Sequence, residues 1–368
     1  MNNVKEWLQK YDELDFAGFF RLCTVGDVDR VLAKDRLLPE DYLTLLSPAA
    51  VERLEEMACR AQAETIKYFG RTVQLFAPIY VSDYCINACV YCGFNRSNHF
   101  TRRQLTLEEV EREAAAISAG GIRHILLLTG EDPARSTVAY MVDCVKILKH
   151  YFSSISIEVY ALTEEQYKLL VDAGVDGMTM FQEVYEEAKY KPLHPAGPKR
   201  DFLFRLNAPE RACRAGIRTI TVGALLGLVP WRQEGFFTGL HAAYLQSRYP
   251  AVDVQLAIPR LRPCTGGYQT RTPAGDVDLV QYVLAYRLFM PHSGICISTR
   301  ERSELRDQMI KLGVTRMSAG VSTAVGGYSE QSRDGQFELA DERSVAEISS
   351  MLKKNGYQPI FQNWHYSL

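Results

Sequence analysis

Residues 73–92 read VQLFAPIYVSDYCINACVYC, an apolar run of ten residues followed by three cysteines within eight positions. A nearly continuous apolar run of this length is typical of a strand buried on both faces, as in a parallel sheet. The cysteines come directly after the run, so they are predicted to lie at the carboxyl end of that strand. This stretch decides the fold because it begins an alternation of apolar runs and amphipathic helices that continues to residue 321.

Eight apolar runs in this alternation are predicted to be strands: 73–82, 122–130, 154–160, 177–185, 219–227, 252–260, 294–300 and 314–321. Strands that are connected through helices must be parallel. Eight such units in about 250 residues predict a closed (β/α)8 barrel of the TIM type rather than an open doubly wound sheet. No G-x-G-x-x-G follows the first run, which weakens the dinucleotide-binding alternative. We expect a helical N-terminal extension over 1–72, a barrel over 73–321, and a C-terminal loop, helix and tail over 322–368.

The composition limits the possible partners. The 368 residues carry a formal net charge of -2, which argues against an electrostatic role on nucleic acid or on an anionic membrane. The N-terminus has no uninterrupted apolar segment of the kind found in secretory signals. The longest apolar runs, such as those at 125–128 and 224–231, are far too short to span a bilayer. We therefore expect a soluble cytoplasmic protein with no nucleic-acid or membrane partner.

Cys85, Cys89 and Cys92 have the spacing C-x3-C-x2-C, and the other six of the nine cysteines are scattered singly. Without a signal peptide, this distribution does not indicate a disulfide framework. Zinc sites with four ligands usually combine two separated pairs, and no second C-x2-C is present. Three thiolates on a [4Fe–4S] cluster would leave one iron without a protein ligand and able to bind a substrate or cosubstrate. A zinc knuckle and a redox-active trio remain alternatives.

The stretch CINACVYCGF (85–94) resembles the signature of the radical S-adenosylmethionine (SAM) enzymes. The resemblance implies a [4Fe–4S] cluster whose open iron binds SAM and cleaves it to methionine and a 5′-deoxyadenosyl radical. It also implies contacts to SAM from several positions: Tyr91 near the adenine, Gly130 and Glu131 in LLLTGEDP at the methionyl amino group, Glu158 at the end of the third strand, and Arg205 at the carboxylate. A structural ion pair is the alternative for Glu158, and a solvated helix position for Arg205.

Farther along the chain, GALLGLVPWR (223–232), IPRLRPCTGG (258–267) and ISTRE (297–301) resemble the radical SAM tyrosine lyases of thiamine biosynthesis. The resemblance runs from about residue 70 to residue 330 and implies cleavage of the Cα–Cβ bond of L-tyrosine to 2-iminoacetate and p-cresol. Arg300 is expected to bind the substrate carboxylate, with an ion pair to Glu301 as the alternative. Ser318 and Gln182, at the ends of the eighth and fourth strands, are further candidates for the catalytic site. No residue is assigned to the substrate side chain.

The same resemblance implies two protein partners, an electron donor such as flavodoxin or ferredoxin, and thiazole synthase. Related lyases provide the alternatives. One is a lyase that acts on tryptophan, and the other is the tyrosine lyase of hydrogenase maturation. The latter carries a further cysteine-bearing domain, whereas no cysteine follows Cys296 here, so its CO-forming step is not expected. A non-catalytic iron–sulfur scaffold is the alternative from a different functional class.

Overall fold

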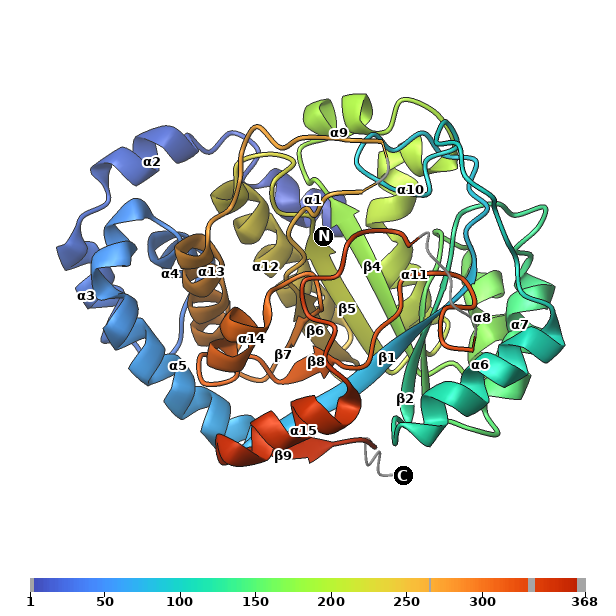
Figure 1. Ribbon diagram of the computed structural model, residues 1–368. Coiled ribbons are helices and arrows are strands. Elements are labelled where there is room, and N and C mark those ends of the chain that lie inside the picture. Colours follow the sequence, from blue (N-terminus) through green and yellow to red (C-terminus); the bar gives the residue numbers. More distant parts are fainter. Residues whose placement is uncertain (1–2, 265, 330–334, 363–368) are drawn as a thin grey trace.

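The computed structural model describes residues 3–264, 266–329 and 335–362. Its centre is a closed barrel of eight parallel strands in sequential order, with β1 paired to both β2 and β8 (Figure 1). The strands are β1 (Thr72–Ser82), β2 (His124–Thr129), β3 (Ser154–Glu158), β4 (Gly177–Glu183), β5 (Thr219–Ala224), β6 (Asp253–Ala257), β7 (Gly294–Ile297) and β8 (Arg316–Ser318). The predicted (β/α)8 barrel is therefore confirmed, with each strand close to its expected position.

Helices connect the strands and cover the outside of the barrel. They are α6 (Leu107–Ala119), α7 (Val138–Leu148), α8 (Glu164–Ala173), α9 (Glu187–Leu193), α10 (Phe202–Leu206), α11 (Ala208–Arg214), α12 (Trp231–Arg248), α13 (Asp276–Phe289) and α14 (Ser303–Met309). Their sequences mark their ends. At the start of α6, Thr106 Oγ1 accepts from the Glu109 backbone N–H, and the Glu109 carboxylate accepts from the Thr106 N–H at 2.7 Å. At the end of α8, Gly174 takes a φ of 122°, which favours glycine.

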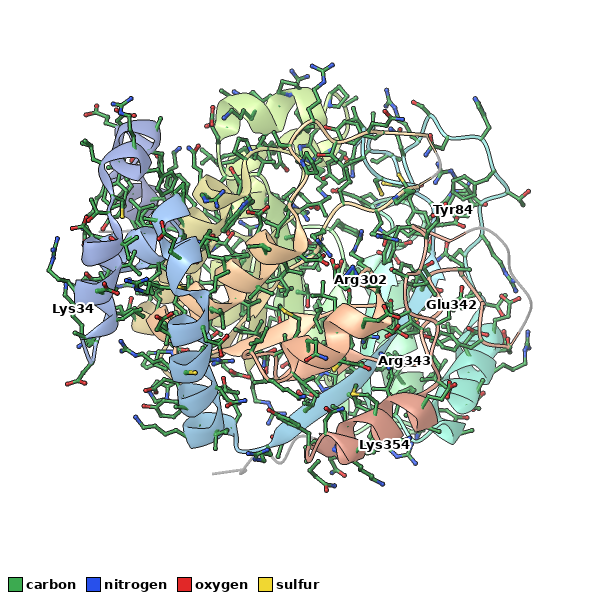
Figure 2. All side chains as sticks on the ribbon, turned by 60° about the vertical axis from the view of Figure 1, so that its left-hand side comes forward. Lys34, Tyr84, Arg302, Glu342, Arg343 and Lys354 are labelled. Carbon is green, nitrogen blue, oxygen red and sulfur yellow. The ribbon has the colours of Figure 1, made fainter. Side chains whose placement is uncertain are left out.

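The N-terminal helices α1 (Val4–Gln9), α2 (Phe16–Leu22), α3 (Val25–Leu32), α4 (Pro39–Leu45) and α5 (Leu54–Phe69) pack on one flank of the barrel, against α12 and α13. Tyr42 joins the two layers. Its ring stacks on Phe289 with centroids 4.6 Å apart, and its hydroxyl donates to the Gly235 carbonyl at 2.9 Å. Figure 2 shows these helices in blue at the outer edge, with Lys34 extending from them. The extension therefore packs against the outside of the barrel, and α2 lies beside the connection that follows β5.

The C-terminal segment returns to the barrel in two places. After α15 (Val345–Lys354), a short strand β9 (Gln358–Ile360) pairs in parallel with the start of β1 (Figure 1). This strand was not expected. Before α15, the segment 322–329 crosses the outside of the barrel, where the Tyr328 hydroxyl donates to the Pro78 carbonyl at 2.8 Å. Residues 330–334 and 363–368 of the predicted C-terminal unit lie outside the described residues. No helix in the described ranges is long and apolar enough to cross a membrane.

Candidate active site at the mouth of the barrel

The cysteine loop follows β1, as its position in the sequence predicted. Cys85, Cys89 and Cys92 are free thiols, and they line one cavity together with Gly130 and Glu131 from the turn after β2. The two segments are tied together, because the Ile86 N–H donates to the Glu131 carbonyl at 2.9 Å. A Cβ at position 130 would lie 2.3 Å from the carbonyl oxygen of Tyr84. Only glycine therefore allows this turn to pack against the loop.

The three sulfurs suit an iron–sulfur cluster. Side-chain amides approach two of them, with Asn87 Nδ2 3.7 Å from Cys85 Sγ and Gln336 Nε2 3.9 Å from Cys92 Sγ. Donors of this kind tune the charge on cluster thiolates. Burial raises the pKa of Cys89 to about 12 and that of Cys92 to about 11, so these thiols need a bound metal to lose their protons. Among the described residues, no three metal-binding side chains converge on a single ion. A [4Fe–4S] cluster instead takes its cysteines on different irons, which fits this donor set.

A charged group lies beside the loop, at the end of β4. Glu183 has a φ of 68°, and its carboxylate pairs with Lys199 at 2.6 Å and with Arg205 at 3.6 Å. Burial opposes ionisation, but the two cations hold the pKa of Glu183 below its ordinary value. Arg205 also donates to the Phe181 carbonyl at 2.8 Å. The predicted residue Arg205 therefore lies in the cavity of the cysteine loop, and it lies there as part of an ion-pair group.

Tyr91 is directed into the protein next to this group. Its hydroxyl lies 2.6 Å from His194 Nε2, and the Lys199 ammonium is 5.6 Å from its ring centroid. Burial lowers the pKa of His194 to about 3, so the imidazole is neutral. Tyr91 is thus held in a fixed orientation beside Cys92, with which it lines a second cavity. Its expected position near an adenine remains a prediction.

Gln182 does not lie where the sequence predicted. It is only 2 % exposed, yet it does not line the cavities that contain the cysteines and Arg300, whereas its neighbours Phe181 and Glu183 do. Successive side chains of a strand point to opposite faces, so Gln182 points away from the barrel interior. The polar side chain at the end of β4 that lines the site is instead that of Glu183.

The barrel interior contains a cavity of about 830 Å³, including its open mouth. Tyr80, Glu158, Arg300 and Ser318 line it near the strand ends. Burial raises the pKa of Glu158 to about 7, and the positive charge of Arg300 partly offsets this effect. No ion pair joins Glu158 to a cation in the described part of the chain, so its alternative as a salt-bridged carboxylate is wrong.

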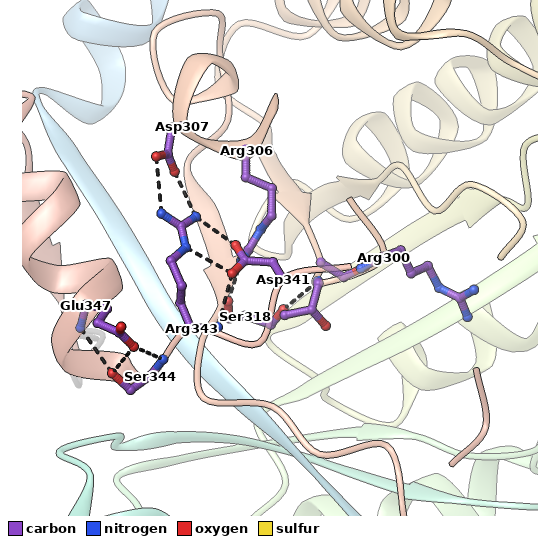
Figure 3. A network of polar contacts seen from close by, with 10 residues as sticks. Arg300, Arg306, Asp307, Ser318, Asp341, Arg343, Ser344 and Glu347 are labelled. Atoms are coloured by element: carbon purple, nitrogen blue, oxygen red, sulfur yellow. Dashed lines mark hydrogen bonds and ion pairs between the residues drawn. The ribbon is translucent and has the colours of Figure 1, made fainter. Parts of the chain in front are cut away.

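Arg300 has no carboxylate partner among the described residues. The alternative that it pairs with Glu301 is wrong, because Glu301 accepts instead from the Arg260 guanidinium at 2.9 and 3.0 Å. The Arg300 guanidinium lies over the Phe337 ring, 3.6 Å from its centroid. Figure 3 shows it directed away from the ion pairs around Asp341. It is therefore a partly buried cation that lines the cavity and is available to an anionic ligand there.

Ser318 is fixed from behind. Its Oγ accepts from the Thr299 N–H at 3.1 Å, and its backbone carbonyl accepts from Arg306. Arg306 pairs with Asp341, which also binds Arg343 at 2.7 Å (Figure 3). The segment before α15 thus braces the end of β8. The Ser318 hydroxyl proton remains free to donate into the cavity, since its recorded hydrogen bond uses the oxygen as acceptor.

Two residues of the site were not identified from the sequence. Lys199 lies in a proline-rich connection after β4, and Gln336 comes from the C-terminal loop. Gln336 accepts from the Tyr80 hydroxyl at 2.9 Å and reaches Cys92 with its amide. Neither lies at the carboxyl end of a strand, so the expectation that polar site residues gather there could not identify them. The glycine at position 93 is the one sequence feature that reflects the approach of Gln336, because a Cβ there would lie 2.4 Å from the Gln336 carbonyl oxygen.

A parallel barrel whose first strand leads into three free cysteines, with a charged cavity at the strand ends, defines a protein of the radical SAM class. The Radical SAM superfamily model matches residues 79–232, and the Biotin and Thiamin Synthesis associated domain matches residues 257–358. The chain is 39% identical to the 2-iminoacetate synthase of Escherichia coli (strain K12) over 343 residues, which cover 93% of this chain and 91% of the relative. This chain belongs to the 2-iminoacetate synthase family.

Solved structures agree with this assignment. The hydrogenase maturase HydG superposes with a TM-score of 0.87 at 31% identity, covering 98% of this chain and 80% of that chain. Methylornithine synthase (PylB) superposes with a TM-score of 0.72 at 21% identity, covering 91% of this chain and 97% of that chain. The second similarity shows the shared fold. The sequence-based recognition of a radical SAM enzyme is thus confirmed.

Proposed function

We propose that this protein is a carbon–carbon lyase that cleaves the Cα–Cβ bond of L-tyrosine to 2-iminoacetate and p-cresol, with SAM consumed to 5′-deoxyadenosine and methionine. The observation that carries the proposal is the partly buried Arg300 guanidinium. It has no carboxylate partner in the described ranges and faces a cavity next to the cysteine loop of a 2-iminoacetate synthase family member. When bound, the [4Fe–4S] cluster and SAM supply the 5′-deoxyadenosyl radical that initiates the reaction.

Each part of the site has a task in this proposal. Cys85, Cys89 and Cys92 hold the cluster, while Gly130 and Glu131 present the turn that receives the methionyl end of SAM. Tyr91, Glu158 and Arg205 line the remainder of the SAM site. The proposal is supported by the cavity that the cysteines share with Gly130, Glu131, Glu158 and Arg205.

The substrate carboxylate binds Arg300, whose planar guanidinium can donate two parallel hydrogen bonds. Phe337 holds that plane from one side. Ser318 donates its free proton to the same end of the substrate. The apolar lining of the cavity excludes water, and this protects an imine product that water would hydrolyse.

We further propose that a flavodoxin or ferredoxin delivers two electrons, one for the cleavage of SAM and one that, with a proton, converts the 4-hydroxybenzyl radical to p-cresol. Thiazole synthase then receives the 2-iminoacetate, and all these proteins act in the cytoplasm. Direct transfer suits an imine that hydrolyses in water.

The test is an anaerobic assay of the reconstituted protein with dithionite, SAM and L-tyrosine. We expect p-cresol, together with glyoxylate from hydrolysed 2-iminoacetate. The variant Arg300→Met should lose p-cresol formation. Its matched control is Arg302→Met, because Arg302 is exposed and pairs with Asp276 on the surface (Figure 2). Release of 5′-deoxyadenosine without p-cresol would indicate a lyase for another amino acid. No SAM cleavage at all would indicate a non-catalytic iron–sulfur protein.

A further inference from the structure

The floor of the barrel cavity carries a second buried arginine. Arg316 is the first residue of β8, and its side chain is 8 % exposed. One guanidinium nitrogen donates to Gln255 Oε1, and another lies 2.9 Å from His124 Nε2. His124 also contacts Gln74 at 2.9 Å and Ser156 at 3.2 Å. These side chains come from five different strands and form one polar layer across the barrel.

The acid nearest to this layer in the hydrogen-bond network is Asp253, which accepts from Gln255 Nε2 rather than from the guanidinium. None of the hydrogen bonds from the Arg316 guanidinium in the described residues goes to a carboxylate, and its Nε has no partner there. A guanidinium can only donate, so His124 Nε2 is the acceptor of this hydrogen bond. The Arg316 side chain lines the barrel cavity, and a guanidinium is a donor only. The floor therefore suits a ligand that presents a hydrogen-bond acceptor.

This layer and the amino-acid anchor face the same cavity. Arg316, His124 and Ser156 line it together with Arg300 and Ser318. Arg316 precedes Ser318 by two positions on β8, which separates them by about 6.6 Å along the strand. That separation is close to the reach of a tyrosine side chain from its Cα to its hydroxyl. The wall between the two ends is apolar, and it includes Phe76, Pro78, Leu126, Leu128 and Phe181.

We propose that Arg316, together with His124 and Ser156, binds the phenol oxygen of the substrate and sets the side-chain specificity of the enzyme. The inference rests on the proposed function, since it assumes that Arg300 holds the carboxylate of the same amino acid. A phenol oxygen accepts from the guanidinium, and the phenol O–H donates a hydrogen bond to the Ser156 oxygen. An indole N–H is a donor only, so it cannot accept a hydrogen bond from Arg316. The ring of phenylalanine carries no hydrogen-bonding group. The floor thus selects tyrosine over both.

The test measures equilibrium binding of L-tyrosine and L-phenylalanine to the anaerobic, reconstituted protein with SAM and without reductant, so that no turnover occurs. We expect the parent protein to bind tyrosine at least about tenfold more tightly, since a hydrogen bond to a charged group contributes that much. Arg316→Met should reduce the affinity for tyrosine and bring the ratio towards one. Ser156→Ala removes a single oxygen and should lower the ratio by a smaller factor, and it covers the case in which Arg316→Met fails to fold.

Arg300→Met is the matched control. It should weaken both amino acids equally and leave the ratio unchanged, because both carry the same carboxylate. Equal binding of tyrosine and phenylalanine by the parent protein would overturn the inference. So would a parent-like ratio in both Arg316→Met and Ser156→Ala. Failure of the parent protein to bind either amino acid would overturn the proposed function itself and, with it, the inference.

Discussion

Glu234 is a buried carboxyl group outside the barrel cavity. It lies on α12, is 2 % exposed, and its Oε2 accepts from the Tyr185 backbone N–H at 2.6 Å. Tyr185 comes two residues after Glu183, so this hydrogen bond fixes the chain just beyond the charged end of β4. Burial raises the pKa of Glu234 to about 8 in spite of the hydrogen bond from Tyr185. The replacement Glu234→Gln keeps an oxygen acceptor for Tyr185 and removes the ionisation.

The sign of the pH effect follows from the two pKa values. The ordinary value is 4.5 and the folded value about 8, so the folded protein holds a proton that the unfolded chain releases between these pH values. Its contribution to stability is fully present below pH 4.5 and is lost as the pH rises through 8. Each pH unit between these two pKa values lowers the free energy of unfolding by about 1.4 kcal/mol, which gives about 5 kcal/mol in total. Glu234→Gln should therefore gain about this much relative to the parent protein between pH 4.5 and pH 8.

Urea unfolding of the anaerobic protein at several pH values between 5.5 and 8.5 measures about 3 kcal/mol of this difference, because about 1.4 kcal/mol is already lost at pH 5.5. The matched control is Glu304→Gln on α14. Hydrogen bonds from its own backbone N–H and from Ser303 hold the pKa of this exposed carboxyl below its ordinary value, so its replacement should bring no gain as the pH rises. A stability difference between Glu234→Gln and the parent protein that is the same at pH 5.5 and pH 8.5 would show that the carboxyl group is not held protonated by burial.

Three further substitutions test the mouth of the barrel. Gly130→Ala should reduce the iron bound per chain several-fold, because the new Cβ would lie 2.3 Å from a backbone carbonyl oxygen. The control is Gly26→Ala, whose Cβ has no atom nearer than 3.8 Å and which should bind as much iron as the parent protein. Cys89→Ala should abolish both the cluster absorbance and SAM cleavage, and normal values of both would disprove the cluster assignment. Phe337→Ala removes the ring that holds the Arg300 guanidinium, so the KM for tyrosine should rise about tenfold while SAM cleavage persists; an unchanged KM would show that the stacking does not position Arg300.

The barrel could be predicted from the sequence because its determinants are local. Apolar runs, the Thr106–Glu109 capping box and Gly174 each act within a few residues, and together they mark where elements begin and end. The three-residue strand β9 escaped prediction, since it pairs in the described residues with the N-terminal overhang of β1, nearly 300 positions earlier. Pairing between such distant segments leaves no periodic pattern in a strand this short.

The mouth of the site could be predicted in part. The cysteine spacing and the expectation that polar residues gather at strand ends located Glu158, Arg300 and Ser318 correctly in the cavity. The same expectation included Gln182, whose side chain points to the other face of β4, because a position at a strand end does not reveal which of the two faces a side chain takes.

The floor was missed for a physical reason. His124 and Arg316 are the first residues of their strands. Active sites of such barrels lie at the opposite ends of the strands, so a search of the carboxyl ends did not include these two residues. A second criterion was available in the sequence: a charged side chain inside an apolar strand needs a partner, which is what singled out Glu158. Applied to Arg316, this criterion asks for an acid, and the guanidinium instead donates to the neutral groups of Gln255 and His124, while the Asp253 carboxylate accepts from Gln255. Neutral partners alone do not indicate a ligand, because the buried Arg287 donates, in the described residues, only to backbone carbonyls and lines none of the cavities described above. Arg316 differs in that it lines the cavity that also contains Arg300, which is why we propose that the substrate site extends from the mouth of the barrel to its floor.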